Sequence, residues 1–347
     1  MGSPKMEFQI GSRWVGEGHP AFIVAEIGYN FTTVEEALAS MEAALECGVD
    51  AVKFQTFRAD TLACRTIDFP PEAGGTNQYE EFKRFEISEE QHRRLFDHGR
   101  KLGLRVFSTP SYYDDVELLE RMEVPLYKVG SDDLTNLPFL EYVGRKGKPV
   151  ILSTGMGTLP EVIEAVEAVR STGNNRMILL HCVSNYPVKN PRLLNLRVIP
   201  ALREFLALPV GFSDHTTGFS AALGAVALGA CVVERHFTLD KKLPVPDAFF
   251  SADPPEMKSL VSQIRELEQS LGDGVKRATP AEMEMRLQTR KSAVARAEIP
   301  EGTPIRGDQI IVKRPGTGVA PAQSARLIGR KAKRKIQAEE VITWDMV

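Results

Sequence analysis

The chain has 347 residues, more than one average domain, so a large domain followed by a small one is expected. It is 43% hydrophobic and 26% charged with a formal net charge of -3, and it lacks the basic excess that nucleic-acid binding favours. No apolar run approaches the roughly 20 residues of a membrane-spanning helix, and MGSPKM carries neither a signal-peptide core nor a myristoylation signal. We therefore expect no nucleic acid and no membrane among the partners.

Short β-rich runs alternate with longer helical patterns from Phe22 onward. Their near-continuous apolar character is typical of parallel strands covered on both faces. The eight expected strands cover residues 22–27, 50–55, 104–109, 126–131, 149–154, 177–183, 208–213 and 230–236. Eight β/α units predict a TIM barrel, whereas the alternative, a doubly wound sheet, would more often show five or six strands and a Gly-rich first turn.

Helical patterns fill most of the intervals between these strands. In residues 33–48, Thr33 and Glu36 predict a capping box, and Ser88 with Gln91 repeats the signal before a second helix. After a helix at 254–272 the chain changes character and ends in short β-type pieces. The predicted organisation is therefore α/β, with a barrel over 1–275, a linker over 276–290 and a small β-rich domain over 291–347.

The four cysteines are scattered without any C-x-x-C pair. Three of Cys47, Cys64, Cys182 and Cys231 lie in or beside apolar runs, so reduced buried thiols are expected rather than disulfides or zinc ligands. This usage favours a cytoplasmic protein.

Polar residues follow all eight expected strands, at the ends where a TIM barrel builds its active site. In chain order they are Glu26; Lys53 and Gln55; Ser108 and Thr109; Lys128, Ser131, Asp132 and Asp133; Ser153 and Thr154; His181, Ser184, Asn185 and Tyr186; Ser213, Asp214 and His215; Glu234, Arg235 and His236. Two lysines among so many hydroxyls suit a phosphate and a carboxylate, which favour charge-assisted hydrogen bonds. The lysines are alternatively solvated, or one is a Schiff-base nucleophile.

Two histidines, His215 and His236, end adjacent expected strands, so their imidazoles can converge. With open positions they would hold a catalytic divalent ion such as Mn²⁺, although a single histidine at a strand end is more often a structural residue. His19, His92 and His98 lie in a loop and a polar helix and are interpreted as structural.

Motifs along nearly the whole chain resemble the sialic acid synthases. They are VAEIG at 24–28, VKFQTF at 52–57, FSTP at 107–110, YKVGS at 127–131, LSTGM at 152–156, LLHCVSNYP at 179–187, GFSDHTTG at 211–218 and VERHFTLD at 233–240. The tail, with RKSAVARAEIPEGTPI at 290–305 and VKRPGTG at 312–318, is similar to their C-terminal antifreeze-like (SAF) domain.

The resemblance implies a reaction. The family condenses phosphoenolpyruvate with an N-acyl amino sugar aldehyde and water, releasing phosphate and a nine-carbon 2-keto acid, with a divalent ion. It implies His215 and His236 as ligands of that ion, Mn²⁺ with Mg²⁺ or Co²⁺ as alternatives. The metal would polarise the aldehyde, and water would capture the oxocarbenium formed when the enol carbon attacks. The family's small domain docks over the barrel of the partner subunit, so a domain-swapped homodimer is expected.

The resemblance also assigns residues to the two substrates. The residues implied for phosphoenolpyruvate are Lys53, Thr109, Lys128, Ser131, Ser153, Asn185 and Ser213. Those implied near the sugar are Glu26, Gln55, Asp133, Tyr186, Asp247 and, from the small domain, Arg314. Glu26, Asp133, His215 and His236 are the expected catalytic set.

This sequence departs from the family pattern on the sugar side. The usual Asn-His-x-Gly is Asn30-Phe31-Thr32-Thr33, the usual Gly-Glu is Asp132-Asp133, and the usual Asp-His-x-x-Ser runs from Asp247 to Ser251 with Ala248 and Phe249 inside. We expect a more apolar acceptor pocket, suited to N-acetylmannosamine or a 6-deoxy di-N-acyl analogue. Two other functions stay open: a class I aldolase acting through a lysine imine, and a non-catalytic carbohydrate- or ice-binding barrel.

Overall fold

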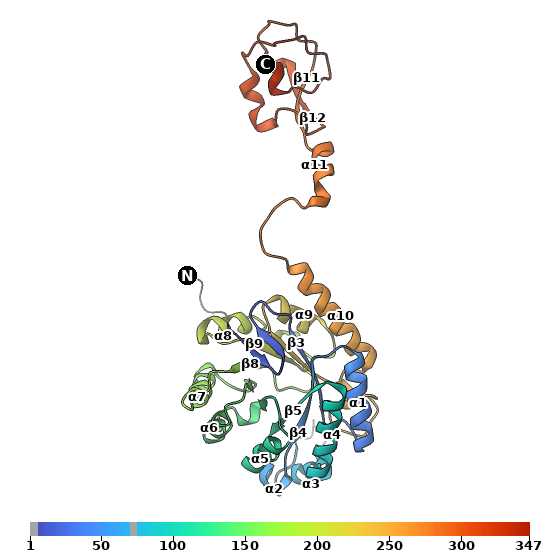
Figure 1. Ribbon diagram of the computed structural model, residues 1–347, viewed down its shortest axis with the longest axis vertical. Helices are drawn as coiled ribbons and strands as arrows, with labels where there is room; N and C mark the ends of the chain where they lie inside the picture. Colours follow the sequence, from blue (N-terminus) through green and yellow to red (C-terminus); the bar gives the residue numbers. More distant parts are fainter. Residues whose placement is uncertain (1–5, 70–74) are drawn as a thin grey trace. The chain divides into compact units, whose positions relative to one another are not determined.

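The computed structural model describes residues 6–69 and 75–347, and the chain divides into two compact units, 1–272 and 273–347 (Figure 1). Within the described ranges, no helix is both long and apolar enough to cross a membrane. The four cysteines are free, with Cys64 exposed and Cys47, Cys182 and Cys231 buried, as their apolar surroundings predict. The two units are described separately below.

The first unit is the predicted TIM-type barrel. Its eight parallel strands pair in the order β5-β4-β3-β10-β9-β8-β7-β6, and β5 and β6, at the two ends of that order, also contact each other. All eight strands lie where the sequence predicts them: β3 (Phe22–Gly28), β4 (Ala51–Thr56), β5 (Arg105–Pro110), β6 (Tyr127–Val129), β7 (Val150–Ser153), β8 (Met177–Cys182), β9 (Val210–Asp214) and β10 (Val232–His236).

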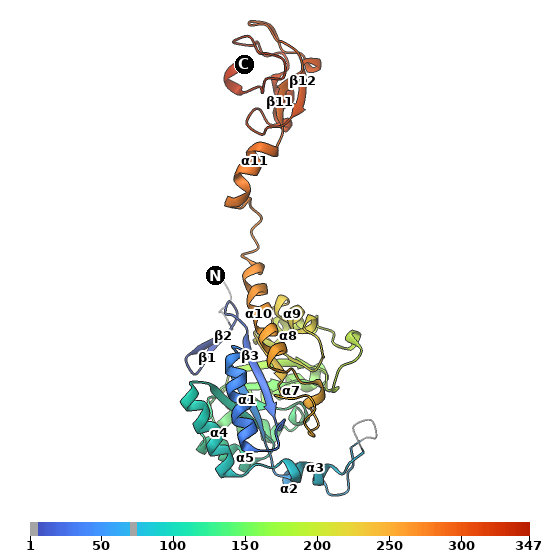
Figure 2. The ribbon, with the colours of Figure 1, turned by 90° about the vertical axis from the view of Figure 1, so that its right-hand side faces the viewer.

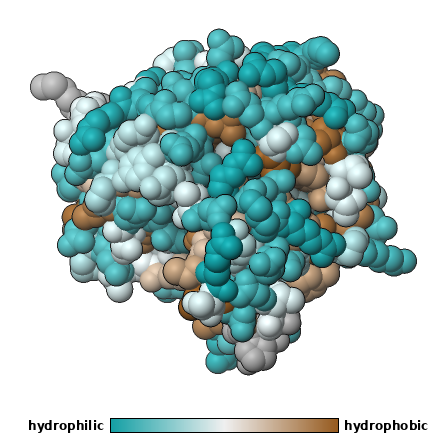
Figure 3. Space-filling view, turned by 90° about the horizontal axis from the view of Figure 1, so that it is seen from below, coloured by the Kyte–Doolittle hydropathy of each residue, from teal (hydrophilic) through white to brown (hydrophobic). Residues whose placement is uncertain are grey.

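Helices surround the strands (Figure 2). Their apolar faces form one large core with the outward side chains of the sheet. They are α1 (Val34–Glu46), α4 (Glu89–Leu102), α5 (Tyr113–Arg121), α6 (Leu137–Arg145), α7 (Leu159–Arg170), α8 (Val198–Leu206), α9 (Ser220–Ala227) and α10 (Pro254–Leu271), with α2 (Ala59–Leu62) and α3 (Gln78–Phe85) between β4 and α4. Seen from below, the surface is predominantly hydrophilic, with smaller apolar areas between polar side chains (Figure 3).

The two predicted helix starts differ in detail. Ser88 and Gln91 form the expected capping box at α4. Thr33 caps α1 by accepting from the Glu36 N–H, but the Glu36 carboxylate accepts from Thr32 instead of closing the box at Thr33. Glu36 still satisfies a free backbone donor at the helix start, so the capping function is kept.

A short N-terminal hairpin, β1 (Glu7–Ile10) and β2 (Arg13–Gly16), was not expected from the sequence. Its buried Ile10 and Val15 belong to one apolar cluster with Phe22, Ala51 and Phe107, which begin or lie within barrel strands. The hairpin therefore packs against the amino-terminal part of the barrel interior. Strands of four residues carry too few alternating positions to stand out in a sequence.

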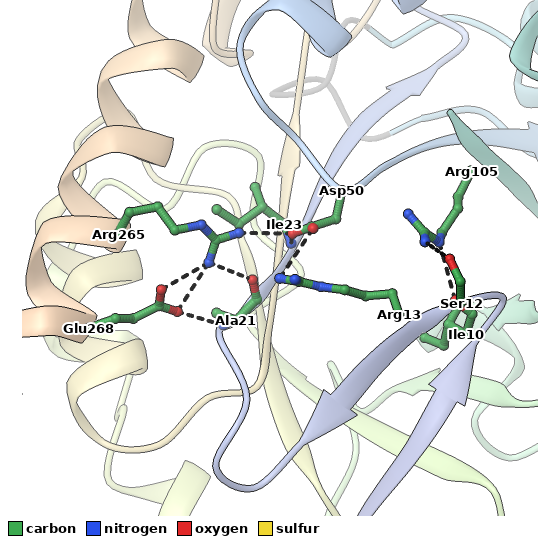
Figure 4. Close-up of polar contacts among 9 residues, drawn as sticks. All are labelled: Ile10, Ser12, Arg13, Ala21, Ile23, Asp50, Arg105, Arg265 and Glu268. Atoms are coloured by element: carbon green, nitrogen blue, oxygen red, sulfur yellow. Dashed lines mark hydrogen bonds and ion pairs between the residues drawn. The ribbon is translucent and has the colours of Figure 1, made fainter. Parts of the chain in front are cut away.

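A polar network joins the first and last β/α units of the ring (Figure 4). Arg265 on α10 donates to the Asp50 carboxylate (2.9 Å) and to the Ala21 carbonyl (2.9 Å). Asp50 also accepts from the Ile23 N–H at the start of β3 (2.9 Å) and pairs with Arg13 of the hairpin (3.3 Å). One carboxylate thus connects the hairpin, β3 and the final helix.

The second unit has its own core, which includes Ala293, Ile299, Leu327, Ile336 and Ile342. Strands β11 (Ser292–Ala295) and β12 (Ile310–Lys313) form a small antiparallel sheet. The expected linker contains a short 3-10 turn (Pro280–Glu282) and helix α11 (Met283–Thr289). The Gly316 N–H donates to the Leu287 carbonyl (2.7 Å), which attaches α11 to the small unit.

Candidate active site

Strand β10 explains why an apolar run ends in three ionisable residues. Val232 belongs to the cluster inside the barrel, whereas Val233 and Phe237 belong to the outer core under the helices. Because side chains alternate along a strand, Glu234 and His236 point inward and Arg235 points outward. The outward Arg235 is 2% exposed and forms an ion pair with Asp214 (2.6 Å).

Lys53 is the centre of a buried charge cluster inside the barrel. Its Nζ lies 2.8 Å from Glu26 Oε2 and 3.9 Å from Glu234 Oε2, and it donates to Thr109 Oγ1 (3.1 Å). Burial opposes the charged ammonium, but Glu234 and Glu26 outweigh it and raise the pKa of Lys53 above its usual value. Lys53 is therefore a cation at neutral pH.

The two carboxylates of this cluster differ in charge state. Burial raises the pKa of Glu26, despite the nearby Lys53, and Gln55 donates to its other oxygen (3.1 Å). Burial also acts on Glu234, but Lys128 and Lys53 outweigh it and lower its pKa. Ser213 donates to Glu234 Oε1 (3.0 Å). A stable anion at Glu234 and a more easily protonated Glu26 follow from these surroundings.

Lys128 brings a second cation to the same region. Its Nζ donates to Ser153 Oγ (2.6 Å) and to the Val129 carbonyl (3.0 Å), and burial lowers its pKa. Beyond it, Ser131 Oγ accepts from the Gly155 N–H (3.0 Å) and lies 3.3 Å from Cys182 Sγ. The two buried lysines and these hydroxyls lie in one region, and the binding of an anion there stays a prediction.

The two predicted ligand histidines lie side by side, with ring centroids 5.6 Å apart. His215 Nδ1 faces the Val183 carbonyl at 2.8 Å, so Nδ1 carries the proton and Nε2 carries the lone pair, with Ser213 Oγ 3.4 Å away. Among residues 6–69 and 75–347, the buried His236 Nδ1 has no hydrogen-bond partner, and it lies 3.6 Å from Asp247 Oδ2. Burial lowers the pKa of both rings, which are therefore neutral at neutral pH.

These features fit a divalent metal ion. A metal-ligating histidine usually donates its other ring N–H to a carbonyl or carboxylate, as His215 does here. The buried ring nitrogen of His236 that lacks a hydrogen-bond partner among the described residues is a second nitrogen that a metal could bind. In the described part of the chain, no group of three or more His, Cys, Asp or Glu side chains is arranged to hold a metal. Two histidines would leave coordination positions open for substrate, as catalytic sites do.

An aromatic wall adjoins the histidines. The Tyr186 ring centroid lies 4.2 Å from that of His215, and Phe250 lies 5.1 Å from His236 and 5.9 Å from Tyr186. Burial, reinforced by Glu26, raises the pKa of Asp247 to about 7. Tyr186 is 49% exposed, so this wall faces open space on one side.

Not every predicted residue joins this cluster. Asn185 is exposed on the loop after β8, and the Asp133 carboxylate accepts from Asn136 (2.9 Å) in the turn after β6, while burial raises its pKa to about 6. Arg314 is an exposed residue of the second unit. The assignments of these three residues remain predictions.

The residues that depart from or flank the family pattern differ in burial and in distance from the site. Phe31 is 6% exposed and packs in the outer core against Phe54, so we find no role for it in lining the site. Ala248 is fully buried and Phe249 is 60% exposed. The next residue, Phe250, contacts His236, and it was not among the residues predicted for the site.

Glu234 is the main residue that the predicted site set omitted. It contacts Ser213 and lies near Lys53, at the centre of the buried cluster. The signal was present, because an inward position two residues before His236 on a buried strand carries a carboxylate that needs a cationic partner. Cys182, interpreted as possible core packing, also borders this region through Ser131.

Comparisons with known proteins identify the relatives of this chain. A family model described as the NeuB family matches residues 40–276, and one described as the SAF domain matches residues 290–347. The N,N'-diacetyllegionaminic acid synthase of Legionella pneumophila is 38% identical over 344 residues, 96% of each chain. The human N-acetylneuraminate-9-phosphate synthase is 36% identical over 344 residues, covering 96% of this chain and 95% of the human one.

Solved structures extend the likeness to the fold. The crystal structure of an N-acetylneuraminic acid synthetase from Leptospira borgpetersenii, in complex with citrate, aligns with a TM-score of 0.73 at 31% identity. The alignment covers 81% of this chain and 95% of that one.

Proposed function

This chain belongs to the NeuB family, and we propose that it condenses phosphoenolpyruvate with an N-acyl amino sugar and water to give a nonulosonic acid and phosphate. Synthases of sialic, legionaminic and pseudaminic acids are among its relatives. The observation that supports the proposal best is the buried pair Lys53 and Lys128, surrounded by hydroxyls, next to two neutral histidines.

The charge balance of the cluster suits an anionic substrate. Two lysines face one stable carboxylate, Glu234, while Glu26 is more easily protonated. The region therefore carries excess positive charge whenever Glu26 is neutral. We propose that Lys53, Lys128, Thr109 and Ser153 hold the phosphate and carboxylate of phosphoenolpyruvate by charge-assisted hydrogen bonds. In the proposal Ser131, Asn185 and Ser213 complete this set.

The sugar aldehyde is proposed to bind beside the histidines, along the exposed side of Tyr186, whose ring packs on His215. A divalent ion held by His215 and His236, Mn²⁺ with Mg²⁺ or Co²⁺ as alternatives, supplies Lewis-acid polarisation of its carbonyl. Gln55, Asp133, Asp247 and Arg314 are proposed to position the sugar. The new C–C bond joins C3 of phosphoenolpyruvate to the aldehyde carbon, whose oxygen becomes a hydroxyl.

Glu26 is proposed to handle the proton of the attacking water. Water adds to C2 of the oxocarbenium and releases a proton, and the adduct then expels phosphate by C–O cleavage. In its ionised form, Glu26, which Lys53 and Gln55 hold in place, can accept that proton, and its raised pKa favours keeping it. Glu234 favours the charged forms of Lys53 and Lys128 while the site is empty.

Phosphate release from phosphoenolpyruvate against a panel of amino sugars tests the proposal. We expect sugar-dependent release that excess chelator abolishes, and His215→Ala or His236→Ala should lower turnover by about 10² to 10³. His19→Ala, at a histidine paired with Glu7 outside the cluster, is the control and should retain activity. Full activity in chelator, or mild effects of both site substitutions, would contradict the metal role.

The acceptor is proposed to be a 6-deoxy di-N-acyl sugar rather than N-acetylmannosamine. Phe250, only 3% exposed, packs against His236 and Tyr186, and Phe249, 60% exposed, packs edge-on against Phe250, so aromatic side chains make the sugar side apolar. Such a surface favours a methyl group over a hydroxyl by about 1 to 3 kcal/mol, so the preference in kcat/KM should be partial. Equal or better kcat/KM with N-acetylmannosamine would show that this choice is wrong.

A lysine-imine aldolase is the second candidate, because Lys128 has the lowered pKa that imine formation needs. Borohydride reduction in the presence of pyruvate distinguishes the two functions. A covalent adduct on Lys128 would support the aldolase, whereas the proposed condensation predicts none.

A further inference from the structure

His92 lies on α4, outside the cluster described above, and the polarity of that helix suggested a structural role. Its side chain is 1% exposed, although helix α4 is rich in charged residues. Burial lowers its pKa to about 4, so the ring is neutral in the physiological range. Both ring nitrogens have partners, and these partners belong to different elements.

The direction of each hydrogen bond follows from the groups involved. His92 Nδ1 lies 2.9 Å from the Ser88 carbonyl, which can only accept, so Nδ1 carries the proton. Nε2 must then accept from Thr56 Oγ1, at 2.9 Å. Thr56 has used its only proton, so it accepts from Ser108 Oγ, at 2.7 Å. A series of hydrogen bonds, each donating in the same direction, runs from Ser108 through Thr56 to His92 and the start of α4.

This series of hydrogen bonds lies on the outer side of the strands whose inner side carries the candidate active site. Thr56 ends β4 immediately after Gln55, and Ser108 precedes Thr109 on β5. The alternation of strand side chains places Thr56 and Ser108 on the outer face, while Gln55 contacts Glu26 and Thr109 contacts Lys53 inside. The outer hydrogen bonds therefore hold the same strand ends that carry two site side chains.

We propose that His92 is a positioning residue for the candidate active site, holding the ends of β4 and β5 against α4 so that Thr109 on the phosphoenolpyruvate side and Gln55 on the sugar side keep their places. The inference rests on the proposed function only in taking phosphoenolpyruvate as the ligand. Apolar side chains would fill this part of the outer core at a lower desolvation cost, and a fully satisfied polar chain instead selects one register of strands and helix.

Two substitutions of His92 each remove one of its two hydrogen bonds and keep the other. His92→Gln keeps an acceptor near the Nε2 position and so preserves the bond from Thr56. His92→Asn keeps a donor near the Nδ1 position and so preserves the bond to Ser88 but loses Thr56. Both variants retain one hydrogen bond of the original two, which matches them for general damage to the fold. His98→Asn, on the same helix at a histidine paired with Glu42, is a further control.

The measurements are phosphoenolpyruvate affinity by calorimetry and hydrogen exchange of the backbone amides in 52–56 and 105–109. We expect His92→Asn to weaken phosphoenolpyruvate binding about tenfold and to speed exchange at these strand ends, because small displacements of positioned groups have large effects. His92→Gln and His98→Asn should stay within about twofold of the unsubstituted protein. If His92→Asn does not fold, Ser108→Ala should show the same loss, because it removes the hydrogen bond from Ser108 to Thr56.

Equal behaviour of His92→Asn and His92→Gln in both measurements would overturn the inference, since it would mean that the bond to the strand ends has no special role. Failure of the unsubstituted protein to bind phosphoenolpyruvate would overturn the proposed function instead. In that case the exchange data decide the positioning role alone, with faster exchange in His92→Asn only supporting it and equal exchange contradicting it.

Discussion

Adjacent residues of one strand have opposite tasks in this protein. Glu234 points into the barrel and faces the lysines, whereas Arg235 points outward and is buried with Asp214, its guanidinium also donating to the Gly218 carbonyl (2.8 Å). Asp214 accepts from the Thr216 N–H (2.9 Å), so the pair stabilises the turn that carries His215. The environment of each charge, rather than its residue type, determines its role.

Removal of one member of this buried pair should be severe. Arg235→Met leaves Asp214 buried without its cation, and we expect a loss of about 3 to 5 kcal/mol in the free energy of unfolding. Urea denaturation measures it. The double substitution Asp214→Asn with Arg235→Met removes both charges and should recover part of the loss. A double variant that is no more stable than Arg235→Met would contradict this account.

The pKa of His92 makes a prediction about acid. Its folded-state value of about 4 lies below the usual 6.5, so the unfolded chain binds the proton more tightly. The neutral ring therefore contributes stability that is fully present above about pH 6.5 and is lost as pH falls towards 4, by about 3 kcal/mol in total. The stability advantage of the unsubstituted protein over His92→Gln should shrink across this window in denaturation curves. Parallel curves would show that His92 does not titrate as expected.

At the scale of elements, the ring depends on the junction between its first and last units. Figure 2 shows α1 and α10 beside each other, and Arg265 on α10 connects Asp50 and Ala21 near the start of β3. Hydrogen bonds from a charged group, partly shielded from water, are stronger than neutral ones. The closure of the barrel thus has a specific polar component in addition to its apolar core.

Substitution at this junction should destabilise the barrel. We expect Arg265→Met to lower the free energy of unfolding by about 2 kcal/mol, because Asp50 loses a charged donor. Arg93→Met is the matched control, since Arg93 forms an exposed pair with Glu89 on α4 and should change stability by less than about 0.5 kcal/mol. Both are measured by denaturant titration. Similar effects of the two substitutions would argue against a special role for the junction.

At the scale of the whole molecule, a site shared between subunits is proposed from the family likeness. Arg314 would then complete the barrel site of a partner chain. Arg314→Ala should raise the acceptor KM or lower turnover while phosphoenolpyruvate binding stays nearly unchanged, because its guanidinium would address the sugar.

Mixing of two inactive proteins tests the shared site directly. After subunit exchange between His236→Ala and Arg314→Ala proteins, half of the dimers are mixed, and one of two sites in each mixed dimer carries neither defect. Activity should therefore return to about a quarter of that of the unsubstituted protein. No recovery despite demonstrated exchange would mean that Arg314 serves its own barrel or none.

The sequence alone determined the eight strands, the barrel, and which residue types gather at the strand ends. These features follow local rules, since apolar runs, caps and the alternation of side chains are readable along the chain. The gathering of lysines and hydroxyls was predictable for the same reason, because Lys53, Lys128 and their hydroxyl neighbours come at the ends of parallel strands that meet at one edge.

Only the tertiary structure decided which of these residues touch one another. The role of Glu234 depends on Lys53 and Ser213 from other strands, and that of His92 on Thr56 and Ser108, which are far from it along the chain. Phe31 and Phe250 are both aromatic replacements or neighbours of family positions, yet one packs in the outer core and the other against His236. Burial and charge state arise from contacts distant in sequence, so a linear pattern does not contain them.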